Sequence, residues 1–239
     1  MKYIVGSAIA IVLSVSSAQA AVVFDGQSGP LSASAKFEVS GSQLFVTLTN
    51  TSMHDVLVPA DVLTAVFFRT AGDVALTPVS GSLATGSSVL WGPGGGGNVG
   101  GEWAYVGGLA IDGVSGTQGI STAGFGLFGP HDLFPGANLD GPDNINGLDY
   151  GLLSLGDDIA SGNAKVTGGT PLIRSSVVFV LEGLPAGFDE SSISGVSFQY
   201  GTDLASEPHV VVPEPATMCL LAAGIAGLVL RRRRAARAA

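Results

Sequence analysis

Apolar residues alternate with polar or small residues along much of the chain, as they do in strands that bury one face. Two such runs, residues 35–39 and 44–48, flank the turn-forming Ser40-Gly41-Ser42 and predict a β-hairpin. Residues 62–68 are apolar except for Thr64, which predicts a strand buried on both faces. Further strands are expected at residues 88–91, 102–109, 124–128, 150–155, 175–181 and 194–200.

The composition of the chain favours strands over helices. Gly, Ser, Thr, Val and Leu are abundant, whereas the long straight-chain residues that cover the exposed faces of helices are scarce. Clusters of Gly, Pro, Asn and Asp separate the short apolar runs. The fold class expected for residues 21–209 is therefore all-β, an antiparallel β-sandwich. The glycine-rich run at residues 92–101 is predicted to be a mobile surface loop.

The first twenty residues have the pattern of a secretory signal peptide. Lys2 is followed by an apolar stretch over residues 4–15, and then by small residues that include Ala18 and Ala20. An apolar stretch of this length is too short for a membrane span, which needs about 20 residues. Residues 1–20 are therefore predicted to be removed by cleavage between Ala20 and Ala21, which makes residues 21–209 an exported ectodomain.

The ectodomain is strongly acidic. Four basic residues against eighteen acidic ones leave it with a formal charge near −14 before Pro213. The four basic residues are Lys36, Arg69, Lys165 and Arg174. A surface of this charge repels a phosphate backbone, so nucleic acid is not expected as a partner. The one cysteine, Cys219, lies outside the ectodomain, so no disulfide is expected there.

The segment from residue 140 to residue 149 is the best candidate for a metal site. Its possible oxygen ligands for Ca²⁺ are Asp140, Asp143, Asn144, Asn146 and Asp149. The spacing is not that of an EF-hand, because Pro142 occupies the third position of the loop and no glutamate occupies the twelfth. Asp and Asn also form turns, so a plain turn is the alternative interpretation.

Aromatic residues provide a second candidate site. Trp91, Trp103, Tyr105 and Tyr200 could line a sugar-binding face, and the alternation places Trp103 and Tyr105 on one side of a strand. Burial in the core of a sandwich is the alternative for the same residues.

No catalytic pattern stands out. The histidines His54, His131 and His209 are far apart in the sequence, and no cofactor motif with its required context is found, so enzyme activity and a cofactor other than Ca²⁺ are not expected.

The C-terminal end has three parts in a fixed order. Pro213-Glu214-Pro215 is followed by fifteen uncharged residues, 216–230, and then by a basic tail over residues 231–239 that begins with four arginines. These arginines are Arg231, Arg232, Arg233 and Arg234. The apolar segment is expected to be a single transmembrane helix, slightly short for a permanent span, and the arginines are expected to hold its end in the cytoplasm.

This end, residues 210–239, resembles a PEP-CTERM sorting domain. The resemblance implies export by the secretion machinery of a Gram-negative bacterium that makes exopolysaccharide, a transient anchor in the inner membrane, and recognition by exosortase near residues 213–215. It also implies transfer to the cell surface or the extracellular matrix. Residues 48–52, 62–68 and 196–202 are similar to segments of the ectodomains that precede such tails.

Three hypotheses for function follow from these features. The first is a surface or matrix protein without enzyme activity, with a structural or adhesive role in an exopolysaccharide or biofilm matrix. The second is a module that binds carbohydrate or calcium through the aromatic face or the loop at 140–149. The third is a secreted hydrolase, which would need a His, an Asp and a Ser brought together by the fold.

Overall fold

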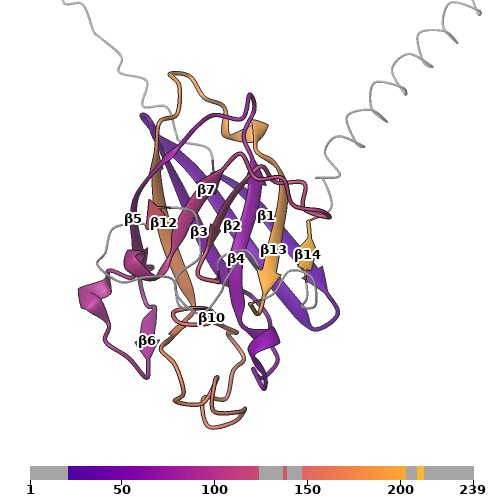
Figure 1. Ribbon diagram of the computed structural model, residues 1–239, viewed down its shortest axis with the longest axis vertical. Helices are drawn as coiled ribbons and strands as arrows, with labels where there is room; N and C mark the ends of the chain where they lie inside the picture. The colour runs from indigo at the N-terminus through magenta and orange to yellow at the C-terminus, as the bar shows by residue number, and fades with distance from the viewer. Residues whose placement is uncertain (1–20, 124–136, 139–146, 203–208, 213–239) are drawn as a thin grey trace, which may run out of the picture.

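The computed structural model describes residues 21–123, 137–138, 147–202 and 209–212, and these form two β-sheets packed face to face (Figure 1). The fold is all-β, as the sequence predicts. One sheet contains β1 (Ala21–Ser28), β2 (Leu31–Ser40), β3 (Gln43–Asn50), β12 (Ser176–Glu182) and β5 (Thr77–Leu83). The other contains β4 (Leu63–Arg69), β6 (Ser88–Leu90), β7 (Ala104–Gly107), β8 (Gln118–Ser121), β9 (Ala137–Asn138), β10 (Leu152–Leu153), β11 (Leu172–Arg174), β13 (Ser194–Tyr200) and β14 (His209–Val211).

The first sheet is antiparallel throughout, in the order β1-β2-β3-β12-β5. The predicted hairpin is its β2–β3 pair, in which Phe37 lies opposite Val46. Gly41 supplies the left-handed backbone of the turn, with φ of 62°. Burial alternates along β2 and β3, so one face of each strand enters the core.

The second sheet is built around β4. This strand pairs with β13 on one side and with β8 and β10 on the other, and six of its seven residues are buried. The prediction of a strand buried on both faces is confirmed. The sequence predicts a purely antiparallel sandwich, but β10 pairs with β11 in parallel. That expectation was therefore wrong for this pair of strands. The chain between these two strands loops out over residues 154–171 and re-enters the sheet in the same direction.

The main core lies between the two sheets. Phe37 of the first sheet packs edge-on against Phe68 of the second with ring centroids 5.2 Å apart, and Trp103 packs against Phe179 at 4.8 Å. A small cluster on the outer face of the second sheet, around Phe67, is covered by the segment after β7. Among the described residues, the buried members of the three hydrophobic clusters lie between Phe24 and Val210, so residues 21–212 contain all of the described core.

The glycine-rich run is not a free loop along its whole length. The amide of Val99 donates to the carbonyl of Gly81 at 3.0 Å, and Val99, Gly100 and Gly101 are buried. A Cβ at Gly81 would lie 3.0 Å from Cα of Gly100, so the absence of side chains at both positions permits this close approach. The expectation of a mobile loop was therefore wrong for residues 98–101, because small side chains also favour close backbone packing.

The two ends of the described chain lie away from the loops that precede β4. The amide of Val212 donates to the carbonyl of Val196 at 3.1 Å, and β13 approaches the last residue of β4 at Ser194. Ala21 pairs with Glu38 near the end of β2. Residues 51–62 and 154–171 form the opposite end of the sandwich, which we call the distal end (Figure 1).

No helix long and apolar enough to cross a membrane occurs in the part of the chain that the structure describes. The predicted transmembrane segment, residues 216–230, lies outside the described residues.

Candidate functional site

The predicted targeting residues flank the described ectodomain. Ala18 and Ala20 lie outside the described residues, and Ala21 is the first residue of β1. The predicted sorting residues at the C-terminal end also lie outside the described residues: Pro213, Glu214, Pro215, Arg231, Arg232, Arg233 and Arg234. The last strand, β14, ends at Val211, so the Pro-Glu-Pro motif begins two residues after the fold is complete.

The predicted calcium loop is described only at its end. Asp140, Asp143, Asn144 and Asn146 lie outside the described residues. Asp149 is half-buried in a turn, where burial raises the pKa of its carboxyl and the charge of Lys165 opposes the shift. Within the described residues, no group of three or more His, Cys, Asp or Glu is arranged to hold a metal ion.

The predicted aromatic face is core. Trp103 is fully buried against Phe179, and Tyr105 and Tyr200 are buried as well. The alternation places Trp103 and Tyr105 on one side of a strand, but that side faces the other sheet and not solvent. Trp91 differs from the other three, since it is 37 % exposed and has a left-handed backbone with φ of 58°. A sugar-binding face made of Trp103 and Tyr105 is therefore excluded.

A buried polar network connects the two sheets near the distal end. The Tyr200 hydroxyl donates to the carbonyl of Ser32 at 2.8 Å, and Asn50 Nδ2 donates to the carbonyl of Leu152 at 3.0 Å. Asn50 Oδ1 accepts from the amide of Ser52 at 3.2 Å. Burial raises the pKa of Tyr200, so its hydroxyl stays protonated and remains a donor. The network satisfies groups of both sheets and is structural.

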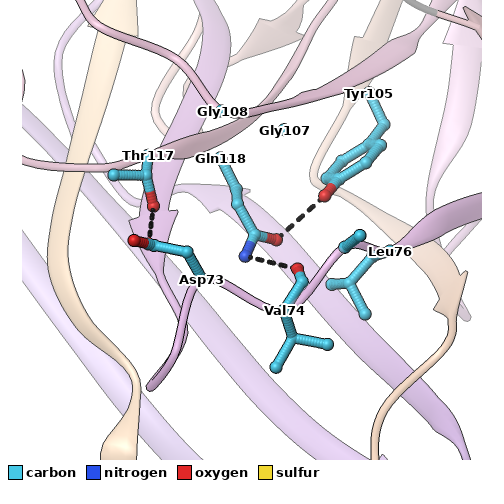
Figure 2. A pocket seen from close by; sticks show the side chains of 9 residues that line it. Asp73, Val74, Leu76, Tyr105, Gly107, Gly108, Thr117 and Gln118 are labelled. Atoms are coloured by element: carbon cyan, nitrogen blue, oxygen red, sulfur yellow. Dashed lines mark hydrogen bonds between the residues drawn. The ribbon is translucent and has the colours of Figure 1, made fainter.

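A pocket of about 330 Å³ opens beside β7 and β8 (Figure 2). Gln118 lies at its centre: its Oε1 accepts from the Tyr105 hydroxyl at 3.0 Å, and its Nε2 donates to Thr70 Oγ1 at 2.6 Å and to the Val74 carbonyl at 3.1 Å. Thr117 Oγ1 donates to Asp73 Oδ1 at 2.7 Å. Burial raises the pKa of Tyr105, which keeps it a donor. Both hydrogens of the Gln118 amide are used, so Gln118 is satisfied within the fold and its role is structural.

Aspartates gather at the distal end instead. The amide of Val56 donates to Asp157 Oδ1 at 2.9 Å, and the amide of Asp158 donates to Asp55 Oδ1 at 2.9 Å. The carboxyls of Asp55 and Asp157 lie within hydrogen-bonding reach of each other. Asp157 is 6 % exposed, and its Oδ2 is buried without a hydrogen-bond partner. Nothing in the local sequence signals this pair, because its members are separated by about a hundred residues.

The pKa shift of Asp157 predicts how the stability of the protein changes with pH. Burial, together with the neighbouring Asp55, raises its pKa above the ordinary value of 3.8. The folded state thus binds this proton more tightly than the unfolded state. The stability that Asp157 contributes is present below the ordinary pKa and is lost as pH rises through the raised pKa.

The Asp157→Asn variant is therefore expected to have a higher free energy of unfolding than the wild type at pH 7, measured in EDTA to remove metal ions. Near pH 4 the two free energies of unfolding are expected to be equal. The gain is about 1–2 kcal/mol, because the new amide donates to the charged Asp55 carboxylate. Urea denaturation across this pH range measures the difference. The variant Asp112→Asn, at an exposed position, is the control. A gain that did not change with pH would contradict this titration.

The histidines are not placed together by the described structure. His54 Nε2 lies 3.9 Å from Asp61 Oδ1, and neither nitrogen of its ring has a hydrogen-bond partner within the described residues. His209 is in β14, which pairs with β13 in the second sheet. His131 lies outside the described residues.

Comparison with protein families identifies one match. The model of the PEP-CTERM protein-sorting motif matches residues 211–234, which is the segment with the Pro-Glu-Pro sequence, the apolar run and the arginines. The motif marks an exported protein that is sorted through the membrane, with exosortase as its processing partner. No curated protein and no solved structure matches the chain.

Proposed function

We propose that the mature protein is a cell-surface or extracellular-matrix protein with a structural or adhesive role, released from its membrane anchor by exosortase. The observation that carries this proposal is the position of the sorting motif relative to the fold. Val210 is buried in the core, Val212 packs against it, and the Pro-Glu-Pro motif begins at the next residue. A cut at the motif therefore removes the anchor and leaves every described strand intact.

The charge and the shape of the ectodomain support a role outside the cell. A formal charge near −14 keeps a protein soluble at high local concentration. The described chain ends lie away from the distal end, so an attachment at residues 212–215 would direct the distal loops outward. The host's exopolysaccharide is the proposed neighbour there, and Trp91 is the exposed member of the four aromatic residues considered for sugar contact.

Mass spectrometry of the protein isolated from its host tests the sorting step. We expect the wild-type mature chain to begin at Ala21 and to end near residues 213–215. Glu214→Ala is expected to retain the C-terminal tail and to stay with the membrane fraction, because the motif read by exosortase is broken. Thr217→Ala, which leaves Pro-Glu-Pro unchanged, is the matched control and should be processed normally.

Two outcomes would overturn the proposal. One is a surface-located wild-type protein that still carries residues beyond Arg231. The other is normal processing of Glu214→Ala, together with normal processing of the wild-type protein in cells that lack exosortase. An adhesive or structural role is tested separately, by cosedimentation of the ectodomain with the host's exopolysaccharide. If the ectodomain stays in the supernatant and its loss leaves the matrix unchanged, that role is wrong even where the sorting is right.

A further inference from the structure

Two distal loops are fastened to each other by hydrogen bonds between residues far apart in sequence. The loops are residues 52–61, before β4, and residues 154–167, after β10. Ser154 Oγ donates to the carbonyl of His54, and the amide of Asn163 donates to the carbonyl of Leu57 at 3.2 Å. Val56 and Val166, one from each loop, share the hydrophobic cluster beneath. The loops therefore behave as one unit.

The Asp55 and Asp157 carboxyls meet at the centre of this unit. Three of their four oxygens have donors: Asp157 Oδ1 accepts from the amide of Val56, Asp55 Oδ1 accepts from the amide of Asp158, and Asp55 Oδ2 accepts from Ser161 Oγ. The fourth, Asp157 Oδ2, has no donor although it is buried. It belongs to a carboxyl that lies within hydrogen-bonding reach of Asp55.

The surroundings supply little positive charge to this pair. In the described part of the chain neither carboxylate forms an ion pair with a Lys or Arg. Arg174 attracts Asp157 from a greater distance, while Asp55 repels it. Asp158 and Asp61 are in the same two loops, and the nearest histidine, His54, lies beside Asp61. Two ionised carboxylates brought together, one of them buried, repel each other unless a cation or a shared proton lies between them.

We propose that the Asp55–Asp157 pair is a divalent-cation site, for Ca²⁺, that fastens the two distal loops. Both carboxylates and the Ser161 hydroxyl are hard oxygen ligands of the kind that Ca²⁺ takes. Asp55 is partly exposed, which leaves room for water to complete the coordination shell. The site differs from the segment at 140–149, and it is independent of how the C-terminus is processed.

Such a site would control the order of the distal end. The loops carry exposed apolar side chains, most prominently Met53 at 76 % and Leu57 at 52 % exposure. Without the cation, the two carboxylates would repel each other and weaken the hydrogen bonds between the two loops. Opening is expected to begin at residues 54–58 and 156–161, while the sandwich beneath stays folded.

Thermal unfolding of residues 21–212 with added CaCl₂ at pH 7.5 tests the site. For a dissociation constant of about 10⁻⁴–10⁻³ M, about 10 mM Ca²⁺ is expected to raise Tm by roughly 3–10 °C over the value in EDTA. Calorimetry should give one site per chain. Hydrogen exchange in Ca²⁺ should slow at residues 54–58 and 156–161 and remain unchanged in β2 and β3.

Matched variants distinguish this site from the segment at 140–149 and from a proton shared by the two carboxyls. Asp157→Asn and Asp55→Asn should lose the response to Ca²⁺, whereas Asp140→Asn/Asp143→Asn should keep it. Asp157→Asn is expected to be at least as stable as the wild type in EDTA, so its loss of response cannot be a failure to fold. The proposal is overturned if Ca²⁺ shifts neither Tm nor hydrogen exchange, or if the response follows Asp140 and Asp143. A third outcome also overturns the proposal: Ca²⁺ has no effect on the wild type, and the wild type but not Asp157→Asn becomes more stable as the pH falls to 5. That result would show that the two carboxyls share a proton.

Discussion

Trp103→Ala is expected to lower the free energy of unfolding by about 3–5 kcal/mol, the usual cost of emptying a fully buried tryptophan site. Trp103 is 0 % exposed, and its ring packs against Phe179 of the opposite sheet at a centroid distance of 4.8 Å. The cavity would lie between the two sheets, where strands paired on both sides cannot readily move to fill it. Urea denaturation of residues 21–212 measures the loss.

Trp91→Ala is the matched control for Trp103→Ala. The Trp91 side chain is 37 % exposed and lies beside Gly168, so its removal is expected to cost less than about 1 kcal/mol. Trp103→Phe should fall between the two, because the buried Nε1 of Trp103 has no hydrogen-bond partner to lose. Equal losses for Trp103→Ala and Trp91→Ala would contradict the assignment of Trp103 to the core.

Asn50→Ala is expected to lower the free energy of unfolding by about 2–4 kcal/mol. The side-chain amide of Asn50 serves the carbonyl of Leu152 at 3.0 Å and the amide of Ser52 at 3.2 Å, and Asn50 is 0 % exposed. Each buried group that loses its partner costs about 1–3 kcal/mol. The loss would be measured by the same urea denaturation, at constant pH.

Two further variants identify the source of the Asn50 effect. Tyr200→Phe removes the hydroxyl that contacts the carbonyl of Ser32 at 2.8 Å and Asn50 Oδ1 at 3.4 Å, and is expected to cost about 1–2 kcal/mol. Thr47→Ala, on the outward face of β3, should cost well under 1 kcal/mol. If Asn50→Ala costs no more than Thr47→Ala, the network does not stabilise the join between the sheets.

The network also joins the three segments that the sequence singles out, residues 48–52, 62–68 and 196–202. Asn50 comes from residues 48–52, Tyr200 and Gly201 come from residues 196–202, and the amide of Gly201 donates to the carbonyl of Val62 at 2.8 Å. The three segments meet at one place in the fold. Asn50 and Tyr200 hydrogen-bond there between the two sheets, so these segments have a structural role in the fold.

Strands with strong alternation were predictable and weak ones were not. The residues of β2, β3, β4, β12 and β13 show long apolar or alternating runs. The sequence placed β3, β4, β12 and β13 within about two residues, whereas β2 begins at Leu31 and not at residue 35. The pattern did not predict β1, β5, β8, β9, β11 or β14, and the strand expected at residues 124–128 lies outside the described residues. In β5, Pro78 and Gly81 interrupt the pattern, and β8, β11 and β14 are too short to show a period. These strands form because neighbours already in the sheet offer hydrogen bonds.

The sequence by itself determined that the chain carries a sorting motif of exported proteins and that the described part of the chain is all-β. A sorting motif is recognised as a linear segment, and a strand's period is local, so both can be read without the fold. The tertiary structure decided which aromatic residues are buried and which aspartates meet. Asp55 and Asp157 come together because β4 and β10 are neighbours in one sheet, so their loops emerge side by side. Contacts of that kind depend on strand order, which the local pattern of residues does not encode.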